Sequence, residues 1–167
     1  MTGPGVAPTN TQFPHRTVAQ ALAKPELVNG THIAAAGVDR ALRQLREQAG
    51  ITEQDIIRVP ALFSKIDLPD DYPRKDLTVT YLPDATIGIS TGTGGYLAPA
   101  QHGPRQGGYD VFQRATEEAL GRAGVRVRWI EDWDYSHYVG TAGGDIHCVT
   151  DVQRDLSGIT PWWRPAR

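Results

Sequence analysis

The distribution of glycine and proline limits the length of the regular elements that this chain can form. The sequence holds 18 glycines and 12 prolines, which cluster at the N-terminus and between Pro69 and Gly108. Glycine loses much conformational entropy on folding, and proline removes a backbone donor and disrupts the interior of a helix. We therefore expect a loop-rich fold.

Two stretches nevertheless have the apolar spacing of amphipathic helices. The first runs from Ile33 to Ala49 and is followed by Gly50, a plausible stop. The second covers about Tyr109–Ala123 and ends at Gly124. In this second helix the side chains expected to face inward are Phe112, Ala115, Ala119 and Leu120.

Short runs of alternating or β-branched residues predict the strands. A further glycine-rich run, Thr91–Gly95, is expected to form a tight hairpin, because it lacks the Lys-Ser/Thr ending of a phosphate loop and opens no helix. The order of elements predicts an α/β or α+β fold with mixed strand pairing. The predicted strands are Ile56–Val59, Leu77–Leu82, Thr86–Ser90, Gly95–Ala98, Val125–Ile130, Ser136–Val139 and Asp145–Val152.

Size and charge restrict the class of protein. With 167 residues the chain is one domain or a piece of one, and we divide it into a flexible lead-in at 1–16 and a folded part at 17–167. A net charge of −2 favours neither a nucleic acid nor an anionic membrane as partner. No apolar run approaches the ~20 residues that span a bilayer, and the N-terminus lacks a secretory pattern, so we expect a cytoplasmic protein.

The segment Gly143-Gly144-Asp145-Ile146-His147-Cys148 contains the only cysteine of the chain. Two glycines before it permit a sharp turn and the close approach of a ligand. A lone cysteine in such a place is either a nucleophile or a small buried apolar residue. In a strand, His147 and Cys148 would point to opposite faces, so we do not expect His147 to act as the base for the thiol.

This cysteine segment resembles the nucleophile segment of the guanidine-modifying, or pentein, superfamily. Four further stretches resemble the C-terminal part of its protein-arginine deiminase branch, in the same order. They are Ala49–Phe63, the Pro-rich stretch from Leu97 to Pro104, Ile130–Tyr138 and the pair Trp162-Trp163.

The resemblance implies a fold and a reaction. The fold would be part of a pentein-type α/β propeller, with about two ββαβ-like modules. The reaction would be hydrolysis of a peptidyl-arginine guanidinium to citrulline and ammonia, with Cys148 as the catalytic nucleophile that forms a covalent thiouronium. The family's base histidine lies in a His-x-Asp motif, and none of the five histidines here has Asp or Glu two positions later. That motif, one guanidinium-binding carboxylate and the family's calcium ligands belong to upstream sequence.

Two residues near the cysteine are candidates for binding the substrate, His137 in the neighbouring predicted strand and Asp145. We expect no metal site, because no Cys or His cluster has metal-ligand spacing. Calcium is implied only by the resemblance. The expected partners are an arginine-containing protein or peptide and, because part of a ring would leave sheet edges exposed, a second chain or self-association.

Two other functions stay open at this point. The chain is alternatively an inactive pentein-like module for binding or assembly, in which Cys148 is a relic. A further alternative is a small-molecule deiminase of the agmatine type, since the Ile-His-Cys segment suits that branch as well.

Overall fold

The computed structural model describes residues 17–65, 71, 77–92, 94–133, 144–153 and 158. Residues 1–16, the predicted strand Ser136–Val139 with His137, and Trp162-Trp163 lie outside this part. The helices are α1 (Val18–Leu22), α2 (Pro25–Ala49), α3 (Val111–Arg122) and the 3-10 helices η1 (Glu53–Asp55) and η3 (Ile146–Val149). The strands are β1 (Phe63–Lys65), β2 (Thr78–Thr80), β3 (Ile89–Ser90), β4 (Gly95–Pro99), β5 (Arg105–Gln106), β6 (Tyr109–Asp110) and β7 (Arg126–Ile130).

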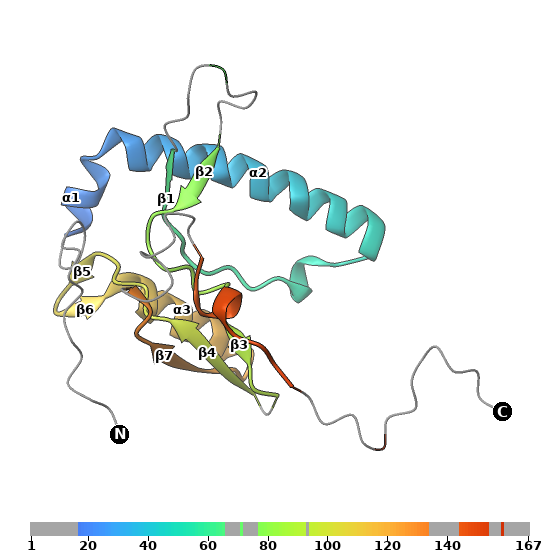
Figure 1. The fold of residues 1–167 in the computed structure, drawn as a ribbon. Coiled ribbons are helices and arrows are strands. Elements are labelled where there is room, and N and C mark those ends of the chain that lie inside the picture. Colours follow the sequence, from blue (N-terminus) through green and yellow to red (C-terminus); the bar gives the residue numbers. More distant parts are fainter. Residues whose placement is uncertain are drawn as a thin grey trace.

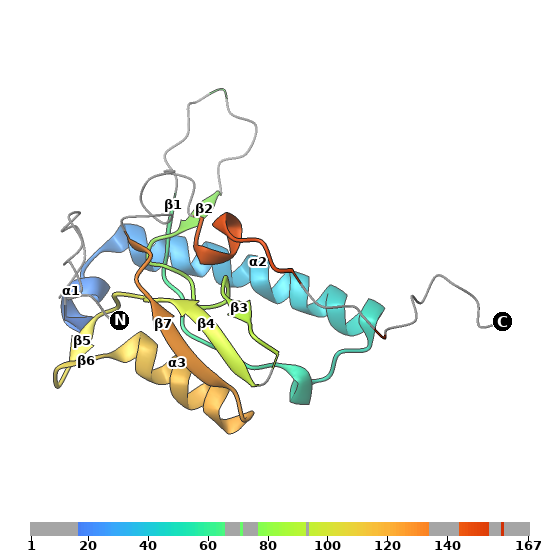
Figure 2. The ribbon, with the colours of Figure 1, turned by 60° about the horizontal axis from the view of Figure 1, so that its bottom comes forward.

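Within the described residues, the strands form three small sheets in an α+β arrangement. β1 pairs with β2 and β5 with β6, each antiparallel. The third sheet has the order β3-β4-β7, and β4 pairs antiparallel with β3 but parallel with β7. Helix α3 lies against this sheet, while α2 crosses over β1 and β2 (Figures 1 and 2). The expected mixed pairing is therefore confirmed, as is the hairpin between β3 and β4, where Thr91 N–H donates to the Gly95 carbonyl at 2.9 Å.

Helix α2 is longer than its apolar spacing predicted. It begins at Pro25, whose fixed φ and missing N–H suit the first turn of a helix, and it ends at Gly50 with φ 68°. Its first half packs directly on β1. A Cβ placed on Gly30 would lie 2.7 Å from the backbone nitrogen of Lys65, and the Thr31 hydroxyl accepts from Phe63 N–H at 3.2 Å. Glycine at position 30 is thus what lets the helix touch the strand.

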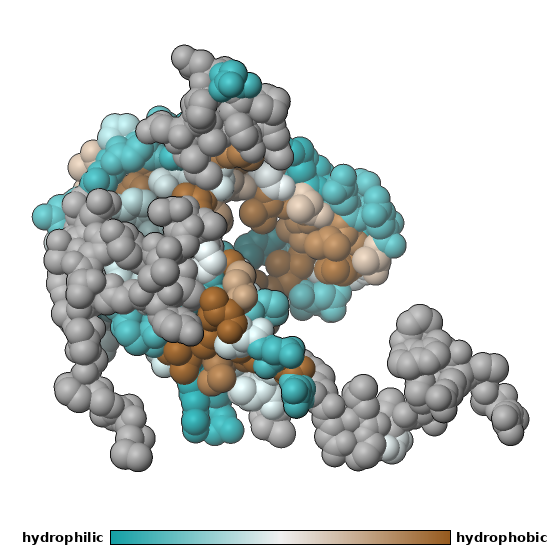
Figure 3. Space-filling model, viewed as in Figure 1, coloured by the Kyte–Doolittle hydropathy of each residue, from teal (hydrophilic) through white to brown (hydrophobic). Residues whose placement is uncertain are grey.

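The apolar stripe of α2 continues beyond this contact. Leu27 near its start is 1% exposed and belongs to the core with Ala21, Leu82 and Trp133. Farther along the same face, Val38 is 58% exposed and Leu45 is 49% exposed. Figure 3 shows a brown, hydrophobic area over the C-terminal half of the helix. Within the described residues, this half of the stripe is uncovered.

The second predicted helix and the strand after it are confirmed in position. Asp110 caps α3 by accepting from Phe112 N–H at 2.9 Å, and Gly124 follows the helix with φ 75°. Ala119 is buried as expected, but Ala115 is exposed and the neighbouring Thr116 is completely buried. The Thr116 hydroxyl is tolerated inside because it donates to Gln101 Oε1 at 3.0 Å.

Other predicted strands are shortened or wrong. Strand Leu77–Leu82 shrinks to β2 and Thr86–Ser90 to β3, because residues 81–88 form turns instead. Ile56–Val59 pairs with no strand among the described residues and follows η1 as an irregular segment. The prediction of a strand over Asp145–Val152 is wrong, since Ile146–Val149 is a 3-10 helix whose backbone bonds are local.

Candidate functional site

The cysteine lies on a short helical turn at the surface. Cys148 is an exposed free thiol on η3. Its backbone N–H donates to the Asp145 carbonyl at 2.8 Å, and the Thr150 hydroxyl closes the turn by donating to the Ile146 carbonyl at 2.7 Å. The sulfur is therefore open to a reagent or substrate, which excludes the buried apolar role that a lone cysteine commonly has.

Asp145 precedes this turn and is fully buried, at 0% exposure. Its side chain does not cap η3. Instead, Oδ2 accepts from the backbone N–H of Asp84 at 2.9 Å, across 61 residues of chain. A second link runs from His147 N–H to the Ile87 carbonyl at 3.4 Å. The cysteine turn thus rests on the Asp84–Gly88 segment between β2 and β3, as Figures 1 and 2 show.

The Asp84–Gly88 segment is itself tightly bonded. Asp84 Oδ1 accepts from Thr86 N–H at 2.8 Å, and the Asp84 carbonyl accepts from Ile87 N–H at 2.9 Å. The Tyr96 hydroxyl on β4 donates to the Ala85 carbonyl at 2.9 Å and accepts from Gly88 N–H at 3.0 Å. Burial raises the pKa of Tyr96, the nearby Asp84 charge adds to this, and the bond from Gly88 N–H opposes it.

Glycines adjoin both ends of this arrangement. A Cβ on Gly88 would lie 2.3 Å from the Leu97 carbonyl oxygen and 2.7 Å from the Tyr96 ring, so no larger residue fits there. A Cβ on Gly144 would lie 3.7 Å from Cys148 Cβ and 4.0 Å from its sulfur, which is ordinary contact. A side chain at position 144 would therefore touch the cysteine side chain.

In the structure, His147 lies on a 3-10 helix and not on the predicted strand. Successive residues of a 3-10 helix differ by about 120° rather than the 180° of a strand, so the alternation that separated His147 from Cys148 does not apply. Both side chains are exposed. Within the described residues, no hydrogen bond joins the imidazole to the sulfur. His137, the other histidine proposed near the cleft, lies outside the described residues.

A second polar group was missed by sequence reasoning. His102 Nε2 lies 2.8 Å from Glu131 Oε1, its ring packs edge-on against Trp133 at 5.3 Å, and its φ of 49° is unusual for a residue other than glycine. His102 and Glu131 follow the carboxyl ends of the parallel strands β4 and β7. That position, where parallel sheets gather ligands, is the signal that could have revealed the pair.

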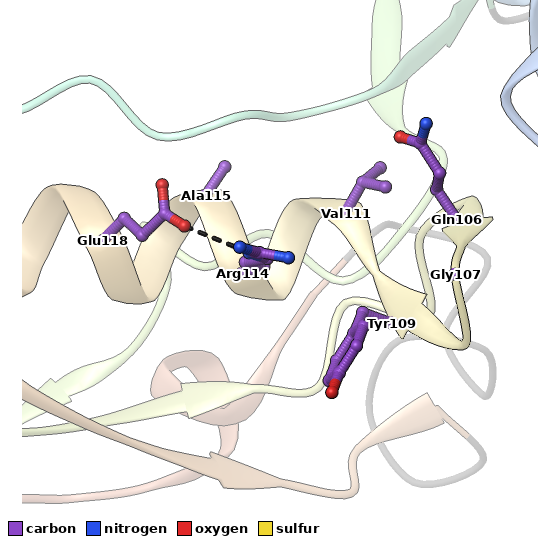
Figure 4. A pocket seen from close by; sticks show the side chains of 7 residues that line it. All are labelled: Gln106, Gly107, Tyr109, Val111, Arg114, Ala115 and Glu118. Carbon is purple, nitrogen blue, oxygen red and sulfur yellow. Dashed lines mark hydrogen bonds and ion pairs between the residues drawn. The ribbon is translucent and has the colours of Figure 1, made fainter.

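In four of the hollows that described residues line, Cys148 is not part of the lining. One of them has a volume of about 570 Å³ and lies beside the first turns of α3. Figure 4 shows its lining side chains, among them Tyr109 and the bonded pair Arg114 and Glu118, whose Nε and Oε1 atoms lie 3.1 Å apart. Another, of about 260 Å³, is apolar and lies between α1, α2 and Phe112. None of these four linings contains a thiol.

No three His, Cys, Asp or Glu side chains among the described residues gather closely enough to hold a cation. None of the helices in this part of the chain combines the length and the apolar character needed to cross a bilayer.

The family of the chain follows from comparison with known proteins. The model of the protein-arginine deiminase family matches residues 4–164, and the chain belongs to this family. The expected resemblance is thereby confirmed. The cysteine turn and the Asp84–Gly88 segment both lie inside the matched range.

The protein is similar to curated deiminases from mammals. Protein-arginine deiminase type-3 from rat and from human are each 26% identical to it over 148 residues. The matched stretch is 88% of this chain but only 20% of each relative. The chain thus corresponds to about a fifth of a whole enzyme of this kind.

Proposed function

We propose that this chain is the nucleophile-bearing part of a protein-arginine deiminase, which hydrolyses peptidyl arginine to citrulline and ammonia. The observation that carries the proposal is the exposed Cys148 thiol on a glycine-flanked turn within the family match. An exposed thiolate is a suitable nucleophile for the poorly electrophilic guanidinium carbon.

The reaction has two halves. The Cys148 thiolate adds to the guanidinium carbon and forms a C–S bond, after which a C–N bond breaks and ammonia leaves with a proton from a general acid. Water then adds to the resulting thiouronium carbon, loses its protons to a base, and the C–S bond breaks. The thiolate returns and the urea group of citrulline is formed, so the balance is guanidinium plus water to urea plus ammonium.

The acid, the base and the guanidinium-binding carboxylates are the parts that this chain does not itself supply in the family pattern. No histidine of the sequence opens a His-x-Asp motif, and none of the hollows described above reaches Cys148. We infer that upstream deiminase sequence completes the site, either on a second chain or on a longer polypeptide. Among the described residues no group of three His, Cys, Asp or Glu side chains could hold a metal ion, and in the family pattern the calcium ligands belong to upstream sequence.

The proposed fold of the complete catalytic unit is a pentein-type propeller. The order β3, β4, α3, β7 supports this, because two adjacent antiparallel strands, a helix and a parallel strand make one ββαβ unit. The β5-β6 hairpin is an insertion in that unit. β1 and β2 would belong to a neighbouring unit.

Complementation tests the function. The chain is mixed with the separately produced upstream catalytic segment of a type-3 deiminase, and citrulline formation from an arginyl peptide is measured with and without calcium. We expect turnover with the mixture that Cys148→Ser abolishes. Ala115→Ser, which changes an exposed residue of α3, serves as the control. Turnover of agmatine but not of the peptide would select the small-molecule alternative.

An inactive module is the competing function, favoured by the missing His-x-Asp motif. A haloacetamidine, an amidinium that carries a leaving group, separates the two. If upstream sequence completes a guanidinium site, this probe should label Cys148 much faster in the mixture than in the chain alone, relative to neutral iodoacetamide. An unchanged ratio together with no citrulline would support the inactive module.

A further inference from the structure

We propose that Asp145 is a positioning residue, whose buried carboxylate fixes the Cys148 turn on the Asp84–Gly88 segment. This inference rests on the proposed function, because it gives Asp145 a task in placing the nucleophile. It replaces the direct contact with substrate that the sequence suggested for this residue.

The Asp145 side chain is buried and hydrogen-bonded. Asp145 is 0% exposed, and Oδ2 is bonded to the Asp84 N–H at 2.9 Å. A carboxylate is costly to remove from water unless strong hydrogen bonds compensate it. A charged acceptor on a backbone N–H is one of the strong kinds. A side chain held in this way is unsuited to reach out to a guanidinium at the surface.

The path from this carboxylate to the nucleophile is short. The carbonyl of the same residue accepts the Cys148 N–H at 2.8 Å. Among its bonds, Asp145 therefore makes one to a distant segment through its side chain and one to the nucleophile through its backbone. If the side chain moves, the turn that carries the sulfur moves with it.

The Asp84–Gly88 segment that binds the Asp145 side chain is itself held in place by several contacts. Tyr96 on β4 bonds to both Ala85 and Gly88, and Gly88 lies too close to the backbone of Leu97 for any side chain. The sheet thus holds the Asp84–Gly88 segment in place, this segment holds the Asp145 side chain, and Asp145 in turn holds the backbone of Cys148. Such precision matters, since a misplacement of about 1 Å can reduce a rate ~100-fold.

The test uses the whole chain and two substitutions. Asp145→Ala removes the acceptor, and Asp145→Asn keeps a neutral oxygen that can still accept the Asp84 N–H. Asp55→Ala is the matched control, because the Asp55 carboxylate also accepts a backbone N–H at 2.9 Å, from Thr52, but on exposed η1. Hydrogen exchange of the Cys148 amide and the pH profile of Cys148 alkylation by iodoacetamide are measured.

We expect Asp145→Ala to speed exchange of the Cys148 amide at least about tenfold, equivalent to ~1.4 kcal/mol, while β4 amides stay protected. The rate of Cys148 alkylation should move toward that of the urea-unfolded chain at each pH. Asp145→Asn should restore most of the protection, and Asp55→Ala should change neither readout. If Asp145→Ala does not fold, the comparison of Asp145→Asn with the parent decides, with a smaller loss expected in the same direction.

Unchanged exchange and an unchanged alkylation profile in the Asp145 variants would overturn the proposal. These readouts need no turnover, so they separate failure of this inference from failure of the proposed function. In the complemented enzyme, Asp145→Ala should lower kcat about tenfold or more and leave KM within about twofold. A rise in KM at constant kcat would instead restore Asp145 as a substrate-binding residue.

Discussion

At the scale of single residues, Gly144 decides how open the sulfur of Cys148 is. A methyl group at this position would make ordinary contact with the cysteine side chain without a clash. We predict that Gly144→Ala changes the free energy of unfolding by less than about 1 kcal/mol. It should slow alkylation of Cys148 severalfold, and more for bulky reagents than for small ones. Alkylation equal to the parent with both reagents would contradict the prediction.

Tyr96 gives the protein a sensitivity to alkaline pH. Its pKa is raised in the folded chain, so above the ordinary value of 10.0 the unfolded state loses the proton first. The unfolded state then binds fewer protons, and stability falls as pH rises through that range, whereas below it the contribution is fully present. Urea unfolding at pH 8, 10 and 11 measures this decline.

Tyr96→Phe should be less stable at pH 8, because Gly88 N–H loses its acceptor, but it should decline less steeply above pH 10. Tyr109, which is 65% exposed, provides the control. Tyr109→Phe should keep the slope of the parent. A slope in Tyr96→Phe as steep as in the parent would show that other groups cause the decline.

Single residues also mark what the sequence can and cannot reveal. Cys148 stands out because it is unique and follows a glycine pair, and both facts are local. The burial of Asp145 depends on Asp84, which lies 61 residues away, and no local pattern contains that pairing. The inward turn of Thr116 likewise depends on Gln101 as its partner.

At the scale of elements, α2 shows how one glycine sets the distance between a helix and a strand. We predict that Gly30→Ala destabilises the fold by about 1–3 kcal/mol, because its methyl would collide with the backbone of β1. Gly37→Ala in the same helix meets only an arginine side-chain atom at 3.9 Å. It should stabilise by about 0.5–1 kcal/mol, since alanine favours the helix. Thermal unfolding of both variants checks the pair, and equal effects would refute it.

The elements that could be predicted are those with long, regular patterns. The helices around Ile33–Ala49 and Tyr109–Ala123 and the strand near Val125–Ile130 show a period over many residues, and glycines end both helices. The segment Asp145–Val152 alternates over only a few residues, which a 3-10 turn satisfies as well as a strand does. Pairing with a distant segment decides between these, and the sequence does not display it.

At the scale of the whole molecule, the uncovered half of the α2 stripe suggests a contact surface. We predict that the isolated chain associates with itself or with upstream deiminase sequence through Val38 and Leu45. Val38→Lys with Leu45→Lys should reduce association in light scattering behind size exclusion, with stability changed by about 0.5 kcal/mol or less per site. Gln44→Lys with Glu47→Gln adds the same charge off the stripe and should leave association unchanged.

A clean monomer in the parent, at concentrations where the deiminase mixture also shows no complex, would contradict this prediction. The chain spans 20% of the length of its curated relatives. Most of the surface of such a relative is therefore formed by sequence outside the matched stretch. Family membership was visible in the sequence from collinear segments. The need for further residues to complete the site around Cys148 was visible in the sequence only through the missing His-x-Asp motif.

The bond between Asp145 and Asp84 also has a kinetic side. Closing a loop of 61 residues costs chain entropy, which is recovered only after the receiving segment has formed. The thiol should therefore acquire its final orientation late in refolding, after the hairpin of β3 and β4 has formed. In a partly folded chain the sulfur would be accessible but not yet held in its final orientation. Its reactivity toward small alkylating reagents should therefore recover earlier than any reaction that requires the sulfur to be oriented toward a bound substrate.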